Sequence, residues 1–285
     1  MPKTYLITGA SSGLGRSLAL AALKAGHTVL ATARNPLLAA QHNPQITAQG
    51  GIWLPLDVTS PDATAHLRAA LGDRAVDVVI NNAGYAVLGA LEDMTDSEVR
   101  AQFETNVFGV VRVLKAVLPL MRARRHGVVV NVSSSAGLDG LAACAGYAGS
   151  KFALEGMSES LARELAPFNI RVLLVEPGTL RTNFWSACVE PAAGMNPDYA
   201  GPALEMTLRR FRENRLRQAG GGDPGKAAQR VVEVVDGTGL GAGLEGLLRL
   251  PLGEDCYRRF EAKVEGLRDT LVQTREIAHS IGVDS

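Results

Sequence analysis

The 285-residue chain has 46% hydrophobic and 20% charged residues, the proportions of an ordinary soluble globular protein, and is long enough for one large or two small α/β domains. Lys and Arg total 29, as do Asp and Glu, and aromatic residues make up 5%, so neither a net charge nor base-stacking side chains indicate a nucleic-acid partner. No apolar run approaches the roughly 20 residues of a membrane-spanning helix, and the three cysteines lack metal-ligand or paired-thiol spacing, so we expect neither a membrane partner nor a metal site.

Along the chain, apolar β-rich runs alternate with longer helical patterns, which is typical of parallel βαβ units. Strands are predicted near residues 4–8, 28–32, 52–56, 76–81, 127–133, 170–175 and 246–250. Helices are predicted near residues 13–25, 61–71, 96–123 and 147–166. Because the first strand begins at Thr4, it leaves no room for a secretory signal, and with so few cysteines we expect a cytoplasmic protein.

The alternation breaks between residues 184 and 225, a stretch with four prolines and a mixed helical pattern. Insertions of this length in compact domains are usually functional lids or disordered segments. We expect a lid over the substrate, with the glycines at 220–222 as its hinge. Residues 253–285 form a C-terminal extension whose helix, predicted over 254–277, should pack on the outside of one domain that spans residues 1–285.

The first strand is followed by a glycine-rich turn that opens the first helix. Gly9, Gly13 and Gly15 have the spacing Gly-x-x-x-Gly-x-Gly. Glycines in such a turn allow the backbone to bend sharply and present its N–H groups to a phosphate. Seen alone, the turn is as readily a purely structural connection between strand and helix.

A second group of polar residues lies in the middle of the chain. Tyr147 and Lys151 are four residues apart, so they share one face of a helix and can reach one ligand. Ser134 ends a predicted strand, at the carboxyl edge of the sheet where open α/β folds bind ligands. Its neighbours Ser133 and Ser135 are rivals, and a lone Tyr-x-x-x-Lys is more often an exposed helical pair.

These segments stand in the order of the short-chain dehydrogenase/reductase family, whose single-domain branch the sequence resembles along nearly its whole length. The matching segments are residues 8–15, 56–58, 81–84, 106, 131–134, 147–151 and 177–178 with Thr182. The resemblance implies a doubly wound α/β Rossmann fold with a seven-stranded parallel sheet in the order 3-2-1-4-5-6-7.

The resemblance also assigns catalytic roles. Tyr147 would exchange a proton with the substrate oxygen, and Ser134 would hydrogen-bond that oxygen. Lys151 would lower the pKa of the phenol and bind the nicotinamide ribose. Asn106 would help to hold a water that links Lys151 to solvent, although a buried asparagine without a relay is an alternative.

For the cofactor, the resemblance implies a binding set made of Gly9, Ser11, Ser12, Gly13, Leu14, Gly15, Arg34, Asp57, Val58, Asn82, Ala83, Gly84, Tyr147, Lys151, Pro177, Gly178 and Thr182. The position where a carboxylate would select NAD is Ala33, and Arg34 follows, which favours NADP(H) because a guanidinium pairs well with phosphate. Some relatives carry a second basic residue where this chain has Ser12, and Arg16 is left open as a substitute. Asn82 is equally an internal brace.

We therefore expect an NADP(H)-dependent oxidoreductase that interconverts a ketone or aldehyde and an alcohol on a lipophilic small molecule. Two alternatives remain open. The same site could carry out dehydration, epimerisation or cyclisation, or the chain could be a non-catalytic NADP-binding regulatory protein. The long helices predicted at 96–123 and 147–166 carry apolar residues on more than one face, so a homodimer or homotetramer is expected.

Overall fold

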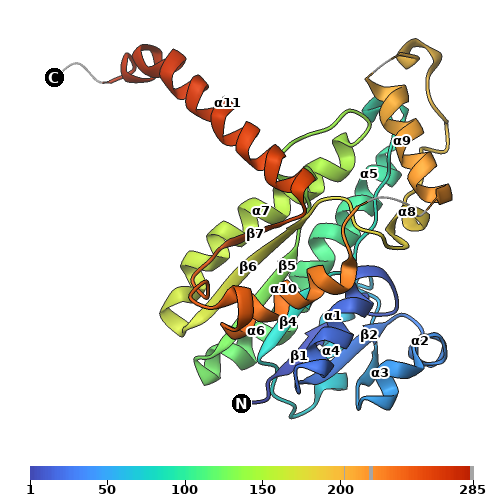
Figure 1. Cartoon of the computed structure of the whole chain (residues 1–285), viewed down its shortest axis with the longest axis vertical. Coiled ribbons are helices and arrows are strands. Elements are labelled where there is room, and N and C mark those ends of the chain that lie inside the picture. Colours follow the sequence, from blue (N-terminus) through green and yellow to red (C-terminus); the bar gives the residue numbers. More distant parts are fainter. Residues whose placement is uncertain (202, 218–220, 283–285) are drawn as a thin grey trace.

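The computed structural model describes residues 1–201, 203–217 and 221–282. Seven parallel strands form one sheet in the order β3-β2-β1-β4-β5-β6-β7, as predicted (Figure 1). The strands are β1 (Thr4–Ile7), β2 (Thr28–Ala33), β3 (Ile52–Pro55), β4 (Val78–Asn81), β5 (Gly127–Val132), β6 (Ile170–Pro177) and β7 (Arg249–Leu252). The doubly wound Rossmann fold is therefore confirmed.

Helices cover both faces of this sheet (Figure 1). They are α1 (Gly13–Lys24), α2 (Pro36–His42), α3 (Pro44–Ala48), α4 (Ala63–Leu71), α5 (Asp96–Phe103), α6 (Gly109–Arg124), α7 (Ala145–Leu165), α8 (Phe184–Ala187), α9 (Leu204–Arg217), α10 (Pro224–Asp236) and α11 (Glu254–His279). Residues of α1 and α10 pack in one apolar cluster, and residues of α4, α6 and α7 in another. Because both faces are covered, central strands such as β4 are buried throughout and lack polar alternation.

The predicted helix over 96–123 is interrupted by one turn of π-helix. A capping box between Thr95 and Glu98 starts α5, and the π-turn, η2 (Glu104–Phe108), then joins α5 to α6. Asn106, a predicted site residue, lies at the middle of that turn. Wide turns of this kind alter which backbone and side-chain groups point inward, and they are frequent at functional sites.

Helix α10 was not predicted. Its valines 231, 232, 234 and 235 are buried, and the helix packs against α1. At its C-terminal end the Asp236 carboxylate accepts hydrogen bonds from Lys3 Nζ at 2.7 Å and from the Tyr5 hydroxyl at 3.0 Å. The β-branched run obscured a helix that tertiary packing stabilises.

The C-terminal helix α11 begins where it was expected, but the expectation that it packs on the outside of the domain is wrong. It projects away from the sheet and its covering helices (Figure 1). Of its 26 residues, Cys256 is the buried one. Across the described part of the chain, no helix is both long and apolar enough to cross a membrane.

Candidate active site

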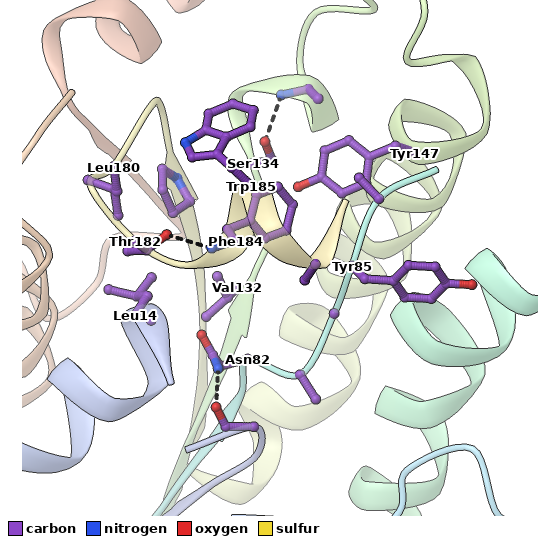
Figure 2. Close-up of a pocket in the computed structure, with 18 of the residues that line it drawn as sticks. Leu14, Asn82, Tyr85, Val132, Ser134, Tyr147, Leu180, Thr182, Phe184 and Trp185 are labelled. Atoms are coloured by element: carbon purple, nitrogen blue, oxygen red, sulfur yellow. Dashed lines mark hydrogen bonds between the residues drawn. The ribbon is translucent and has the colours of Figure 1, made fainter. Parts of the chain in front are cut away.

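A cavity of about 950 Å³ opens at the carboxyl edge of the sheet, between the glycine-rich turn and the segment that contains α8 and α9 (Figure 2). Nearly all predicted site residues line it. They are Gly9, Ser11, Ser12, Gly13, Leu14, Arg34, Asp57, Val58, Asn82, Ala83, Gly84, Ser134, Tyr147, Lys151, Pro177, Gly178 and Thr182. Gly15 and Asn106 are buried in the surrounding wall.

The glycine-rich turn has a shape that side chains would destroy. Gly9 and Gly13 have φ angles of +64° and +54°, which L side chains rarely adopt. A Cβ on Gly15 would lie 2.4 Å from the Gly9 carbonyl oxygen. The turn therefore brings its backbone and the N-terminus of α1 to the cavity edge, and this cradle fits the pyrophosphate of a dinucleotide.

Asn82 braces this turn from the neighbouring strand. Its Nδ2 donates to the carbonyl oxygens of Thr8 at 3.0 Å and Gly9 at 3.3 Å, while the backbone N–H groups of Asn82 and Ala83 donate to Thr8 Oγ1. The brace that the sequence left as an alternative is present. Asn82 also lines the cavity, so the same side chain borders both the turn and the cavity.

At the end of β2, the consecutive residues Ala33 and Arg34 line the cavity wall. The hydroxyl and backbone N–H of Thr59 donate to the Asp57 carboxylate at 2.7 and 3.0 Å and lower its pKa. The exposed guanidinium of Arg34 adds a smaller effect in the same direction. Arg16 lies beside Gln45 and is not among the residues that line the cavity.

Ser134, Tyr147 and Lys151 meet at the end of β5. Ser134 follows that strand, and its hydroxyl accepts a hydrogen bond from the Ala136 backbone N–H at 3.1 Å and acts on the phenol of Tyr147. Burial raises the pKa of Tyr147, and the hydrogen bond with Ser134 opposes this shift. The direction is opposite to the lowered pKa expected from the sequence, because the phenol is enclosed by apolar groups.

Lys151 is buried one helical turn beyond Tyr147. Its Nζ donates to the Val132 carbonyl oxygen at 2.8 Å and lies 5.8 Å from the centre of the Tyr147 ring. Burial lowers the pKa of Lys151 to about 8, and the negative charge of Glu155 opposes this shift. The ammonium therefore remains charged at neutral pH while lining the cavity beside the phenol.

Asn106 braces the loop that contains Tyr85, a residue that lines the cavity. Its Nδ2 donates to the Tyr85 carbonyl oxygen at 3.1 Å and to Ser150 Oγ at 3.0 Å. Its Oδ1 accepts from the Tyr85 backbone N–H at 3.2 Å. The side chain thus braces this loop, and a water relay from Lys151 through Asn106 stays a prediction.

Behind Lys151 lies an acid pair that the sequence interpretation missed. Glu155 on α7 and Glu176 on β6 are 4% and 0% exposed, and the negative charge of Glu155 acts on the Glu176 carboxyl. Arg249 on β7 approaches Glu155 at 3.1 Å and Glu176 at 3.2 Å. Burial is the main cause that raises both pKa values, that of Glu176 to about 8, so the pair keeps a proton at neutral pH.

A signal for one member existed in the sequence. Glu155 follows Lys151 by four residues and Tyr147 by eight, so all three lie on one face of α7. Glu176 and Arg249 lie far apart in the sequence, and the parallel pairing of the adjacent strands β6 and β7 brings them together.

Ser134, Tyr147, Lys151 and Asn106, with the acid pair behind them, are called the floor of the cavity below. On the other side of the cavity, aromatic residues of the 184–217 segment cover it. The Phe184 ring lies 6.0 Å from that of Tyr147, and Trp185 lies 5.1 Å from Phe211, measured between ring centres. Leu208 of α9 is buried beneath them in the same apolar cluster. Of the proposed glycine hinge, residue 220 lies outside the described residues, and Gly222 forms a β-bridge with Leu180.

Three charged residues that the sequence interpretation did not place also line the cavity. Arg210 comes from α9, while Asp255 and Arg259 come from the first turns of α11. Asp255 accepts a hydrogen bond from the Thr179 backbone N–H at 2.8 Å. The C-terminal extension therefore contributes to the wall of the site, a contribution that a helical pattern alone does not reveal.

The parallel sheet, the dinucleotide cradle and the Ser-Tyr-Lys group define a Rossmann-type oxidoreductase. A comparison with family models identifies residues 3–192 as short chain dehydrogenase. The match covers most of the chain, which therefore belongs to the short-chain dehydrogenase/reductase family.

Individual relatives agree with this assignment. An oxidoreductase from Passalora fulva, claN, is 49% identical over 211 residues, which cover 74% of this chain and 96% of that protein. A 3-ketodihydrosphingosine reductase from Bacteroides thetaiotaomicron is 38% identical over 237 residues, with 82% and 84% coverage. The crystal structure of a short-chain dehydrogenase from Streptomyces avermitilis matches with a TM-score of 0.87, 36% identity and 99% coverage of both chains.

Proposed function

We propose that the chain is an NADP(H)-dependent oxidoreductase that interconverts a ketone or aldehyde and an alcohol on a lipophilic small molecule. The observation that carries the proposal is that Ser134, Tyr147 and Lys151 line the same cavity as the glycine-rich turn. A dinucleotide in that cradle would reach from the turn toward the phenol. The chemistry then follows from the three side chains.

The bound dinucleotide would supply or accept the hydride. In the reduction direction Tyr147 gives a proton to the substrate oxygen, and its raised pKa keeps that proton on the phenol at neutral pH. Ser134 hydrogen-bonds the same oxygen as negative charge develops there. Lys151 places a positive charge beside the phenol and offers N–H donors to the ribose hydroxyls.

The preference for NADP(H) rests on the end of β2. Ala33 removes the carboxylate that would repel a 2′-phosphate, and Arg34 places an exposed guanidinium at the cavity wall. A guanidinium can bind a phosphate through two parallel charge-assisted hydrogen bonds. Its charge already acts on Asp57, at the adenosine side of the cavity.

The lipophilic substrate is supported by the cover over the phenol. Phe184, Trp185 and Phe211 form a continuous series of ring contacts above Tyr147. The name of the Bacteroides thetaiotaomicron relative describes a reductase of a lipid ketone. Arg210 and the residues from α11 add polar groups to the cavity wall, so an apolar substrate with a polar end fits best.

The test is a panel of lipophilic ketones, aldehydes and alcohols, assayed with NADPH or NADP and in parallel with NADH or NAD. We expect turnover that follows the absorbance of NADPH, and a product that differs from the substrate by two hydrogens in mass spectrometry. Stoichiometric NADPH binding with no turnover across the panel would contradict the proposal. A product formed without net oxidation or reduction of the substrate would indicate dehydration, epimerisation or cyclisation instead.

We also propose that one oxidoreductase domain includes the lid and the C-terminal extension, and that it assembles as a homodimer or homotetramer. The helical face formed by η2, α6 and α7 supports this assembly, because the large apolar side chains of Phe108, Leu120 and Phe152 are exposed there. Light scattering at micromolar concentration should give at least twice the mass of one chain.

A further inference from the structure

Helix α11 is long for a helix with so little support. Its 26 residues extend about 39 Å, and it projects from the body of the protein (Figure 1). Most helical stability in proteins comes from packing of an apolar face rather than from intrinsic propensity. A helix of this length with an exposed apolar face therefore requires a covering surface.

Residues of α11 and the turn that follows it form a regular stripe, mainly apolar but with Thr274 in it, called the α11 seam below. It repeats at alternating intervals of three and four residues, the spacing of positions a and d in a coiled coil. The seam consists of Tyr257, Phe260, Val264, Leu267, Leu271, Thr274, Ala278 and Ile281. Phe260 and Val264 are half-buried, whereas Leu267, Leu271 and Ile281 are 54%, 72% and 85% exposed.

Charges beside the seam indicate which partner fits. In a parallel pair of α11 helices, Lys263 would face the partner subunit's Arg268, and like charges would repel on both sides of the seam. In an antiparallel pair centred near residue 269, Glu261 faces the partner subunit's Arg275, and this attractive contact occurs twice, while Arg268 faces the partner subunit's Arg268 once. Two attractive contacts against one repulsive contact favour the antiparallel orientation over the parallel one, in which both charge contacts are repulsive.

The sizes of the seam residues agree with the same orientation. Leu267 would pack on the partner's Leu271 at the centre, and the bulky Phe260 would pack on the partner's small Ala278. Antiparallel pairing also places the two bodies at opposite ends of the helices, whereas parallel pairing crowds them at one end. A two-fold contact of this kind is the commonest form of homo-oligomer interface.

We propose that the α11 seam pairs antiparallel with the α11 seam of a second copy of this chain. This surface is distinct from the η2–α6–α7 face, and the two together would build a tetramer from two dimers. Pairing also bears on the catalytic cavity, because Asp255 and Arg259 at the root of α11 line it and Asp255 holds the Thr179 backbone.

The first experiment replaces two central seam residues in the full chain, L267E with L271E, and measures mass by light scattering over a range of concentrations. We expect the assembly mass to fall by half. The matched control is V272E, because Val272 is 78% exposed on the same helix but lies off the seam. This control should keep the wild-type mass, and an unchanged mass in the double variant would overturn the proposal.

The second experiment tests orientation by exchanging charges. E261R alone and R275E alone should each weaken association, because each places like charges together, and the combined E261R/R275E variant should restore it. Failure of the combined variant to recover would reject antiparallel pairing.

A third experiment measures sedimentation with phosphatidylglycerol vesicles. If the chain binds the vesicles through the seam while L267E with L271E leaves the assembly mass unchanged, the seam binds a lipid surface and the proposal is overturned.

Discussion

The floor and the lid of the cavity are held together by different kinds of contact. On the floor, Asn106 and Lys151 are buried and hydrogen-bond backbone groups of other segments. The lid, taken as residues 184–217 of the predicted 184–225 insertion, contacts Tyr147 through the ring of Phe184. Two backbone hydrogen bonds of Val189 tie the lid to residues 86–88, and its ion pair between Arg212 and Glu190 is exposed. Exposed ion pairs contribute little to stability, whereas buried hydrogen bonds fix geometry.

This difference matches the demands of the proposed reaction. Proton transfer requires fixed distances between the phenol, the substrate oxygen and the nicotinamide, so its groups belong on buried elements. Substrate entry requires a cover that can open, so its residues belong on a weakly held segment. The same fold can then accept different substrates through changes in the lid alone.

The largest expected effect comes from the floor. Y147F should lower kcat by roughly 10²- to 10⁴-fold, because it deletes the proton donor, while NADPH affinity stays nearly unchanged. K151A should harm both quantities, since the ammonium serves the phenol and the ribose. Steady-state kinetics and NADPH fluorescence titration measure the two separately. A fully active Y147F enzyme would show that the proton comes from another group.

Replacing Arg34 tests whether an exposed residue of the cavity wall can contribute strongly to cofactor binding. Arg34 is exposed like much of the lid, yet R34A should weaken NADPH binding by about 1.5–3 kcal/mol, because a charge-assisted phosphate contact is lost. NADH binding should change little. Equal losses for both cofactors would contradict the NADP assignment.

The acid pair gives the floor a pH dependence of its own. Burial raises the pKa of Glu176 from 4.5 to about 8, so between these values the folded chain holds a proton that the unfolded chain has released. Stability should therefore fall as pH rises through that window, by at most about 1.4 kcal/mol per pH unit from this group. E176Q should flatten the dependence, as measured by urea unfolding at pH 5.5 and 8.

Substitutions of the two members of the acid pair should shift the alkaline limb of the kcat–pH profile in opposite directions. The charge of Glu155 raises the pKa of Lys151, so E155Q should move this limb to lower pH. E176Q should leave the pair's remaining charge on Glu155 and move the limb to higher pH. Arg249 also pairs with Glu159, and the Cys256 thiol lies near Glu176, so E159Q and C256S serve as controls. Identical shifts in E155Q and E176Q would reduce the pair to a structural role.

Much of this floor could be predicted from the sequence because its spacing is local. Tyr147 and Lys151 are one helical turn apart, and the glycine turn lies within seven residues. The strand order followed from the family resemblance and was confirmed. The contact between Glu176 and Arg249 was not predictable in this way, because it depends on the register of β6 against β7.

Two helices show other limits of the sequence. The valines of α10 resemble a strand when they are considered alone, and their packing against α1 decides the helix. For α11 the amphipathic pattern predicted a helix correctly, but it could not say what covers the apolar face. The expectation that α11 packs on its own domain was wrong because it assumed that the rest of the same chain covers this apolar face.

The smallest expected effect concerns the lid, and it tests the comparison directly. Amide hydrogen exchange in residues 184–217 should be faster than in β4 and β5 of the free protein, because ring contacts and exposed ion pairs open more readily than buried strands. NADPH with substrate should slow exchange there by a few-fold, more than in the sheet, since Phe184 and Trp185 would close over the ligand. W185A should reduce this protection and raise KM while leaving NADPH affinity unchanged. If exchange in the lid ignores both ligands, the substrate lies elsewhere and the lipophilic assignment, which depends on this cover, is lost with it.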